Sequence, residues 1–161
     1  MCYTHPFRGG MINMLPDGRA LGVTLSTETT LTIQSILYTN TATRCPDIRF
    51  IWSHAGGTAP FLASRIDGAS RGAKERMPAG FMATLKTFYY DLAGATNPGA
   101  VASLLQLVQP ERVLFGTDFP PGGAAADYVT SIRELKMFSE AALRAVERDN
   151  AVRLLPRLAS S

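Results

Sequence analysis

Three short apolar segments, each followed by a polar residue, constrain the fold of this chain most strongly. They comprise residues 48–53, 88–90 and 112–115, and sequence with a helical pattern separates them. Continuous apolar runs of this length are typical of strands that are buried on both faces of a parallel sheet. Strands that alternate with helices form βαβ units with right-handed crossovers. The sequence therefore predicts an α/β fold with a parallel sheet.

Two segments between these strands have the pattern of amphipathic helices. Residues 97–108 begin with Asn97 at a capping position and Pro98 at the first helical position, and apolar residues then recur at helical spacing. Another helix is expected to start near Thr27 and to end before Pro46. The glycine-rich and proline-rich residues 6–22 are expected to form a loop, as are residues 67–76.

The polar residues after the strands lie where active sites of α/β proteins form. His54, Asp91 and Asp118 each follow a predicted strand, and His5 ends a short segment with the pattern of a strand end. The carboxyl ends of parallel strands meet at one edge of a sheet, where the βα loops converge. Two glycines after His54 allow close approach of a ligand, which favours a functional histidine over a structural one. Asp91 is compatible with a helix cap or with support of a histidine.

Composition excludes several other classes of protein. With 161 residues, the chain has the size of one domain, and residues 1–161 are interpreted as a single partial domain. Its net charge of +3 comes from scattered lysines and arginines, so no nucleic-acid partner is expected. No apolar stretch approaches the roughly 20 residues of a membrane span, and the signal-peptide pattern is missing. We therefore expect a cytoplasmic protein without a membrane partner.

An ordered set of short motifs covers nearly the whole chain. The motifs are His5-Pro6, Glu28-Thr29-Thr30, Pro46-Asp47, Ser53-His54-Ala55-Gly56-Gly57 with Pro60-Phe61 and Arg65-Ile66, Phe88-Tyr89-Tyr90-Asp91, and Leu114-Phe115-Gly116-Thr117-Asp118-Phe119-Pro120. In order and spacing they resemble the amidohydrolase-related family that includes aminocarboxymuconate-semialdehyde decarboxylase and the resorcylate and methylsalicylate decarboxylases. Each motif alone is weak evidence, whereas the ordered set is specific.

The resemblance implies a TIM barrel, (β/α)₈, with a divalent metal at its rim, commonly zinc and alternatively manganese. His5 would end the fifth strand as a metal ligand, and His54 would end the sixth as a catalytic acid or base. Residues 88–91 would form the seventh strand. Asp118 would end the eighth as a metal ligand that also transfers a proton. Arg8 is a candidate for binding the substrate.

The sequence departs from this family at the first strand, where the family has a His-x-His motif with two further metal ligands. Here the only histidines are His5 and His54. Because a complete barrel needs about 250 residues, we expect the chain to be the C-terminal portion, about strands 5 to 8, of a truncated form. His5 and Asp118 alone would give a metal fewer protein ligands than catalytic zinc usually has.

The implied function is that of a metal-dependent carboxy-lyase, a non-oxidative decarboxylase of a small aromatic or unsaturated carboxylic acid. Two alternatives stay open, namely a metal-dependent hydrolase of the same superfamily and a non-catalytic half-barrel that associates with another subunit. A half-barrel has unpaired sheet edges and an uncovered inner face. We therefore expect a homo-oligomer or another association through these barrel edges.

Overall fold

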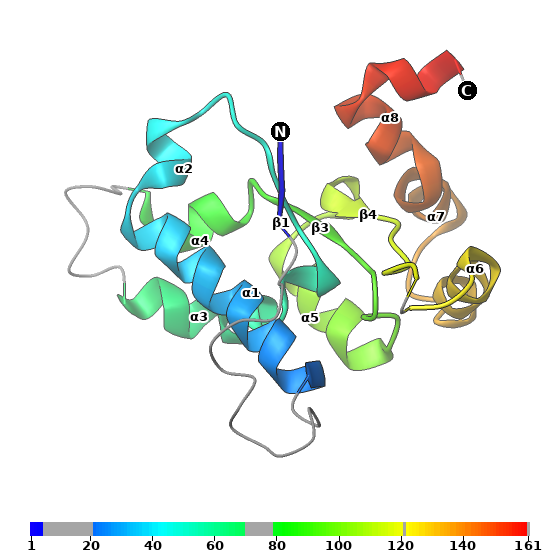
Figure 1. The fold of residues 1–161 in the computed structure, drawn as a ribbon, viewed down its shortest axis with the longest axis horizontal. Helices are drawn as coiled ribbons and strands as arrows, with labels where there is room; N and C mark the ends of the chain where they lie inside the picture. Colours follow the sequence, from blue (N-terminus) through cyan, green and yellow to red (C-terminus); the bar gives the residue numbers. More distant parts are fainter. Residues whose placement is uncertain (5–20, 70–78, 121, 161) are drawn as a thin grey trace.

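The computed structural model describes residues 1–4, 21–69, 79–120 and 122–160. At its centre is a four-stranded parallel sheet whose strand order follows the chain (Figure 1). The strands are β1 (Cys2–Thr4), β2 (Phe50–Trp52), β3 (Tyr89–Asp91) and β4 (Val113–Leu114). The predicted α/β class and parallel sheet are confirmed. The segments 48–53 and 112–115 contain their strands, whereas β3 extends one residue beyond the segment 88–90, to Asp91.

Helical segments connect the strands and follow the last one (Figure 1). They are α1 (Leu21–Tyr38), α2 (Thr41–Arg44), η3 (His54–Gly56), α3 (Ala59–Ala69), α4 (Gly80–Leu85), α5 (Pro98–Leu107), η5 (Pro110–Arg112), α6 (Ala125–Glu134), α7 (Glu140–Arg144), η6 (Ala145–Asp149), α8 (Asn150–Leu154) and η7 (Pro156–Ser160). In the described part of the chain, no helix combines the length and the apolar character that a membrane crossing requires.

The larger core lies between one face of the sheet and the helices. Phe50, Trp52 and Tyr90 contribute to it from the strands, since alternate residues of a strand share a face. Their helical partners include Ile33 and Leu37 of α1, Ala63 and Ile66 of α3, Phe81 and Leu85 of α4, Val101 and Leu104 of α5, and Ile132 of α6. The aromatic rings of Phe50 and Trp52 stack at a centroid distance of 5.9 Å. This core fixes the strands whose ends carry the polar residues.

A smaller apolar cluster lies on the opposite face of the sheet. It consists of Ile51 from β2, Leu114 from β4 and Leu154 from α8, with Tyr89 packed against it. The strand residues between those of the larger core thus contact the C-terminal helix. In a closed barrel this face would be the inner one.

The helix boundaries partly agree with the sequence prediction. In α5, Asn97 caps the helix as expected, because its Oδ1 accepts a hydrogen bond of 3.0 Å from the Ala100 N–H. The predicted start near Thr27 is wrong, since α1 already begins at Leu21. The Thr27 hydroxyl donates to the carbonyl of Val23, one turn earlier, so Thr27 lies inside α1 and does not cap it.

The predicted loop of residues 67–76 is also partly wrong. Helix α3 continues to Ala69, and the Asp67 Oδ1 accepts a hydrogen bond of 2.7 Å from the Met82 N–H of α4. Asp67 therefore links two consecutive helices. Residues 70–76 of the predicted loop, and most of the loop predicted for residues 6–22, lie outside the described residues.

Asn150 attaches α8 to the amino-terminal side of β4. Its side chain is 1% exposed, and its Nδ2 donates to the carbonyls of Pro110 and Val113, at 2.8 Å each. The Asn150→Ala substitution removes both bonds and leaves two carbonyls without this donor. We expect the free energy of unfolding to fall by about 2–4 kcal/mol, measured by urea denaturation. Asn97→Ala, which removes one exposed cap, should cost only about 1 kcal/mol. An equal loss in the two variants would contradict this role of Asn150.

Candidate active site

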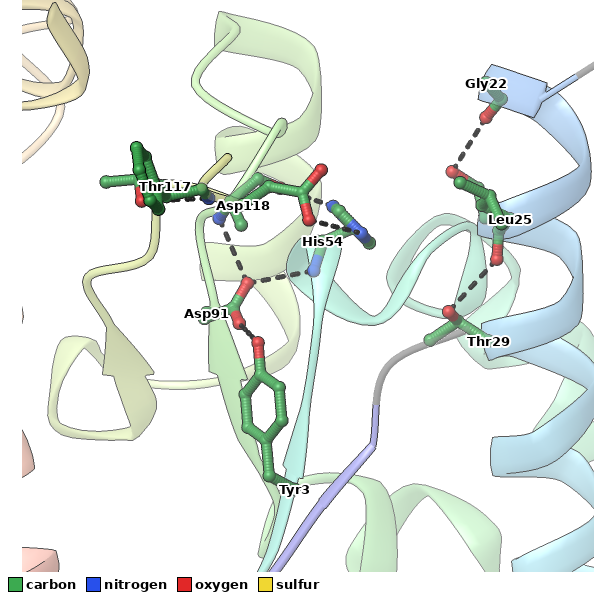
Figure 2. A network of polar contacts seen from close by, with 11 residues as sticks. Tyr3, Gly22, Leu25, Thr29, His54, Asp91, Thr117 and Asp118 are labelled. Atoms are coloured by element: carbon green, nitrogen blue, oxygen red, sulfur yellow. Dashed lines mark hydrogen bonds and ion pairs between the residues drawn. The ribbon is translucent and has the colours of Figure 1, made fainter. Parts of the chain in front are cut away.

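His54, Asp91 and Asp118 come together at the carboxyl edge of the sheet (Figure 2). His54 follows β2, Asp91 is the last residue of β3, and Asp118 follows β4. The His54 Nε2 lies 3.9 Å from the Asp118 Oδ1, and both side chains are largely buried, at 12% and 24% exposure. The sequence-based prediction that these residues meet is therefore confirmed.

The imidazole ring of His54 is oriented by a backbone carbonyl. Its Nδ1 lies 2.8 Å from the Ala93 oxygen. A carbonyl oxygen only accepts hydrogen bonds, so we assign the proton of the neutral ring to Nδ1. The Nε2 lone pair then faces Asp118. This arrangement gives His54 a nitrogen that can take up a proton, on the side of the ring where the Asp118 carboxylate lies.

His54 lies in a tight left-handed turn, residues 54–57. The φ angles are 54° at His54, 55° at Ala55, 77° at Gly56 and 65° at Gly57. Non-glycine residues in this region cost roughly 1–3 kcal/mol each and persist only where the surroundings hold them. Two backbone hydrogen bonds close the turn, from the Gly56 N–H to Ser53 and from the Gly57 N–H to His54. The chain therefore leaves the direction of β2 at His54, the residue that carries the imidazole ring.

The two glycines of this turn serve packing within the protein. A Cβ on Gly56 would lie 2.7 Å from the Tyr90 ring, and one on Gly57 would overlap with the backbone carbonyl of Ser26 in α1. We expected the missing side chains of these glycines to leave room for a ligand. This expectation is corrected, because the Tyr90 ring and the α1 backbone occupy the positions that their Cβ atoms would take. Gly57 still borders the cavity described below.

Asp91 is a buried carboxylate that contacts the protein interior. It is 3% exposed, its Oδ1 accepts hydrogen bonds from the backbone N–H groups of His54 and Ala93, and its Oδ2 accepts one from the Tyr3 hydroxyl (Figure 2). Burial raises the pKa of Asp91, although these hydrogen bonds act in the opposite direction. Burial, followed by the charge of Asp91, raises the pKa of Tyr3 above its ordinary value of 10.0. Asp91 therefore binds the backbone around His54 and has little contact with solvent.

A cavity of about 310 Å³ adjoins His54 and Asp118. Its walls also include residues from the first two turns of α1, Gly94, and Asn97 at the start of α5. Its volume falls at the lower end of the range for small-molecule pockets, about 300–1,000 Å³. A larger cavity of about 430 Å³ is lined by Arg49 and Arg112 at the amino ends of the strands. We assign chemistry to the smaller cavity, because active sites of such sheets form at the carboxyl ends.

The described residues include only one of the two predicted metal ligands. They contain no group of three or more histidine, cysteine, aspartate or glutamate side chains arranged to bind a metal together. Of the two predicted ligands, Asp118 is described, whereas His5 lies outside the described residues, as does the predicted substrate-binding Arg8. Asp118 alone does not fit the ligand set of a catalytic zinc site, which has three protein ligands.

Sequence reasoning missed two supporting groups, namely the Tyr3 hydroxyl and the Ala93 carbonyl. Tyr3 and His5 are two residues apart, so strand alternation could have placed both side chains on one face. The Ala93 carbonyl leaves no signal in the sequence, because every residue has a carbonyl and only the fold brings this one to the ring.

A parallel sheet with polar residues at its carboxyl edge is typical of α/β enzymes, in barrels and open sheets alike. The amidohydrolase family model matches residues 8–157. The chain therefore belongs to the amidohydrolase family, a family of enzymes, and the resemblance to its decarboxylases is confirmed.

Curated relatives of this chain are decarboxylases. Decarboxylase yanB of Aspergillus niger is 33% identical over 137 residues, which cover 81% of this chain and 37% of that protein. The 6-methylsalicylic acid decarboxylase of Penicillium expansum is 33% identical over 118 residues, which cover 70% of this chain and 36% of that protein. The chain thus spans well under half the length of these relatives.

Solved structures of similar proteins show the same fold. The 2,6-dihydroxybenzoate decarboxylase from Rhizobium has a TM-score of 0.76 and 22% identity, over 96% of this chain and 50% of that chain. A dihydroxybenzoic acid decarboxylase from Polaromonas, solved with manganese and the inhibitor 2-nitroresorcinol, has a TM-score of 0.72 and 24% identity, over 94% and 48%. The sheet and helices described here therefore match about half of the fold of these amidohydrolases.

Proposed function

We propose that this chain is the part of a metal-dependent decarboxylase that corresponds to strands 5 to 8 of the barrel. Its substrate would be a small aromatic acid, such as the hydroxybenzoates that give the similar enzymes their names. The observation that carries the proposal is the His54–Asp118 pair, which adjoins a cavity large enough for a small ligand. Residues 1–161 would form one partial domain, in a cytoplasmic protein.

His5 and Asp118 would be metal ligands in this proposal, with the remaining ligands supplied from outside the described residues. The metal would be zinc or manganese, and manganese is the ion in the structure of the Polaromonas enzyme. A bound divalent metal would supply a Lewis acid for a substrate oxygen. Arg8 would bind the substrate carboxylate as a planar, bidentate cation.

The proposed reaction breaks the bond between the ring carbon and the carboxylate, releases carbon dioxide, and adds one proton to that ring carbon. His54 is suited to transfer this proton. Its Nδ1 is held by the Ala93 carbonyl, so only Nε2 is available to exchange a proton. Asp118 lies 3.9 Å from Nε2, on the side of the ring where this proton would be transferred. Each turnover consumes this proton, so water that enters the cavity would return one to Nε2.

The two sheet edges give a route to association. Among the described residues, β1 and β4 each pair with a single strand, so each has an open edge. Unpaired edges of this kind bind further strands. We propose that the chain forms homo-oligomers, or binds another subunit, through these edges.

The function is tested by metal content and carbon dioxide release. If association with another subunit supplies the metal ligands that this chain lacks, the purified protein should contain near-stoichiometric zinc or manganese by elemental analysis and should release carbon dioxide from 6-methylsalicylate or 2,6-dihydroxybenzoate. Asp118→Asn should lose both metal and turnover. Asp127→Asn, which changes an exposed carboxylate of α6, should retain both.

Other outcomes would distinguish the alternatives. Full metal content in Asp118→Asn would contradict the role of Asp118 as a ligand. Hydrolysis of aromatic esters or amides without carbon dioxide release would support a hydrolase. A chain with neither metal nor turnover that elutes as a stable oligomer in size-exclusion chromatography would support the non-catalytic half-barrel.

A further inference from the structure

We propose that Asp91 is a positioning residue of the decarboxylation, which fixes the direction of the His54 ring and the nitrogen that carries its proton. This inference rests on the proposed function. It is carried by a set of hydrogen bonds around the Asp91 carboxylate (Figure 2). This carboxylate binds the backbone of His54 and also the backbone of Ala93, whose carbonyl orients the His54 ring.

The central contact is a shared acceptor. The Asp91 Oδ1 accepts a hydrogen bond of 2.9 Å from the His54 N–H and one of 3.0 Å from the Ala93 N–H. The carbonyl of the same Ala93 lies 2.8 Å from the His54 Nδ1. The backbone of His54 and its ring are therefore anchored to one oxygen, directly and through Ala93. A shift of this oxygen would move both anchors.

The second oxygen of Asp91 is itself oriented. The Tyr3 hydroxyl donates to Oδ2, and it reaches across from β1 past β2 to the end of β3 (Figure 2). Asp91 is 3% exposed, so water has little access to compete for these oxygens. The three donors stabilise a buried carboxylate that has lost most of its hydration. Tyr3, His54 and Asp91 thus tie the ends of three strands together.

The backbone of His54 needs such an anchor. Its φ of 54° and that of 55° at Ala55 lie in the left-handed region, which is unfavourable for residues with a Cβ. Two residues after the end of β2, the His54 N–H donates a hydrogen bond to the Asp91 carboxylate. Without that acceptor, the turn has a lower-energy alternative in the right-handed or extended regions. The ring would then leave the Ala93 carbonyl and its position beside Asp118.

The consequence for chemistry is the choice of tautomer. With Nδ1–H bonded to Ala93, the neutral ring has its lone pair on Nε2, which faces Asp118 and the cavity. A histidine that rotates freely samples both tautomers, and the tautomer with Nε2–H has no lone pair to offer there. When this tautomer is protonated, the new proton is on Nε2, from which it can pass to the substrate. Asp91 would therefore raise the fraction of His54 that takes up and delivers its proton at Nε2.

The test is ¹⁵N NMR of the imidazole rings at alkaline pH, where histidine is neutral, with the His54 signals identified by their loss in His54→Asn. The wild-type chain should show His54 with its proton on Nδ1. Asp91→Ala should give a mixture of tautomers, and in the decarboxylation assay kcat should fall by about 10–100-fold with little change in KM. Asp91→Asn keeps an acceptor oxygen and should restore the single tautomer.

A purely structural role of Asp91 is separated by a destabilised control. Asn150→Ala should lose a comparable amount of stability at a remote position and keep one tautomer. If Asp91→Ala does not fold, Asp91→Ser takes its place, since a serine hydroxyl is too short to bridge the two N–H groups. A folded Asp91→Ala or Asp91→Ser chain with the proton still fixed on Nδ1 would overturn the proposal.

The two proposals fail in different ways. A single wild-type tautomer that is lost in Asp91→Ala, in a chain that releases no carbon dioxide, would support the positioning role and contradict the decarboxylase. Carbon dioxide release with unchanged kcat in Asp91→Ala would support the decarboxylase and contradict the positioning role.

Discussion

Replacement of His54 by asparagine is expected to lower kcat of the proposed decarboxylation by about 10²–10⁴-fold, the usual contribution of a general acid or base. The Nε2 beside Asp118 is the group that would transfer the proton, and asparagine is too short to place a nitrogen there. Asparagine tolerates left-handed φ better than other residues with a Cβ, so the turn at φ 54° should persist. Carbon dioxide release measures the effect, and urea unfolding verifies that the fold is intact.

The matched control for this variant is Lys136→Asn. Lys136 also has a left-handed φ, of 52°, but it is exposed at the end of α6, outside the residues that line the candidate cavity. This variant should retain full turnover. If the His54→Asn chain keeps kcat within a small factor of the wild type, His54 does not transfer the proton.

Gly57→Ala is expected to lower the free energy of unfolding by about 2–5 kcal/mol, or to prevent folding, because it combines backbone strain with overpacking. Gly57 has a φ of 65°, and an added Cβ would overlap with the Ser26 carbonyl and lie 3.0 Å from the Thr30 Oγ1. The Ser26 carbonyl belongs to the backbone of α1, so the helix itself would have to move. Urea denaturation measures this loss.

Gly22→Ala provides the comparison. Gly22 lies in α1, the helix that Gly57 contacts, but an added Cβ at Gly22 would have no atom within 4 Å. Alanine has the higher helix propensity, so this variant should gain up to about 1 kcal/mol of stability. Equal stabilities of the two variants would mean that α1 does not restrain the turn at Gly57.

The strands could be predicted from the sequence, whereas the start of α1 could not. The segments around Phe50, Tyr90 and Val113 are short, apolar and bounded by polar residues, and all three side chains are buried in the core. Ser26 and Thr27 have hydroxyls that suit caps and loops as well as helices. Here both hydroxyls donate to carbonyls four residues earlier, as they can only once the helix has formed. The sequence alone therefore does not distinguish this helical role from a cap or a loop.

For the site, position along the strands was sufficient to predict that His54 and Asp118 meet. It was insufficient for their orientation, because the Ala93 carbonyl and the left-handed turn are set by tertiary contacts. The glycines after His54 were interpreted as room for a ligand, but the pattern does not distinguish a ligand from a neighbouring ring or helix backbone. His5 and Arg8 stay predictions, since both lie outside the described residues.

The strand order has a consequence for synthesis on the ribosome. From β2 onward, each strand pairs with the strand that precedes it in the chain, so its partner has already been made when it emerges. Domains fold from the N-terminus while the chain is being synthesised, and strands that wait for late partners are exposed to aggregation. In the described sheet, each strand from β2 onward therefore covers the edge that the preceding strand left open, as soon as it is translated, whereas the outer edge of β1 gains no partner from the later strands.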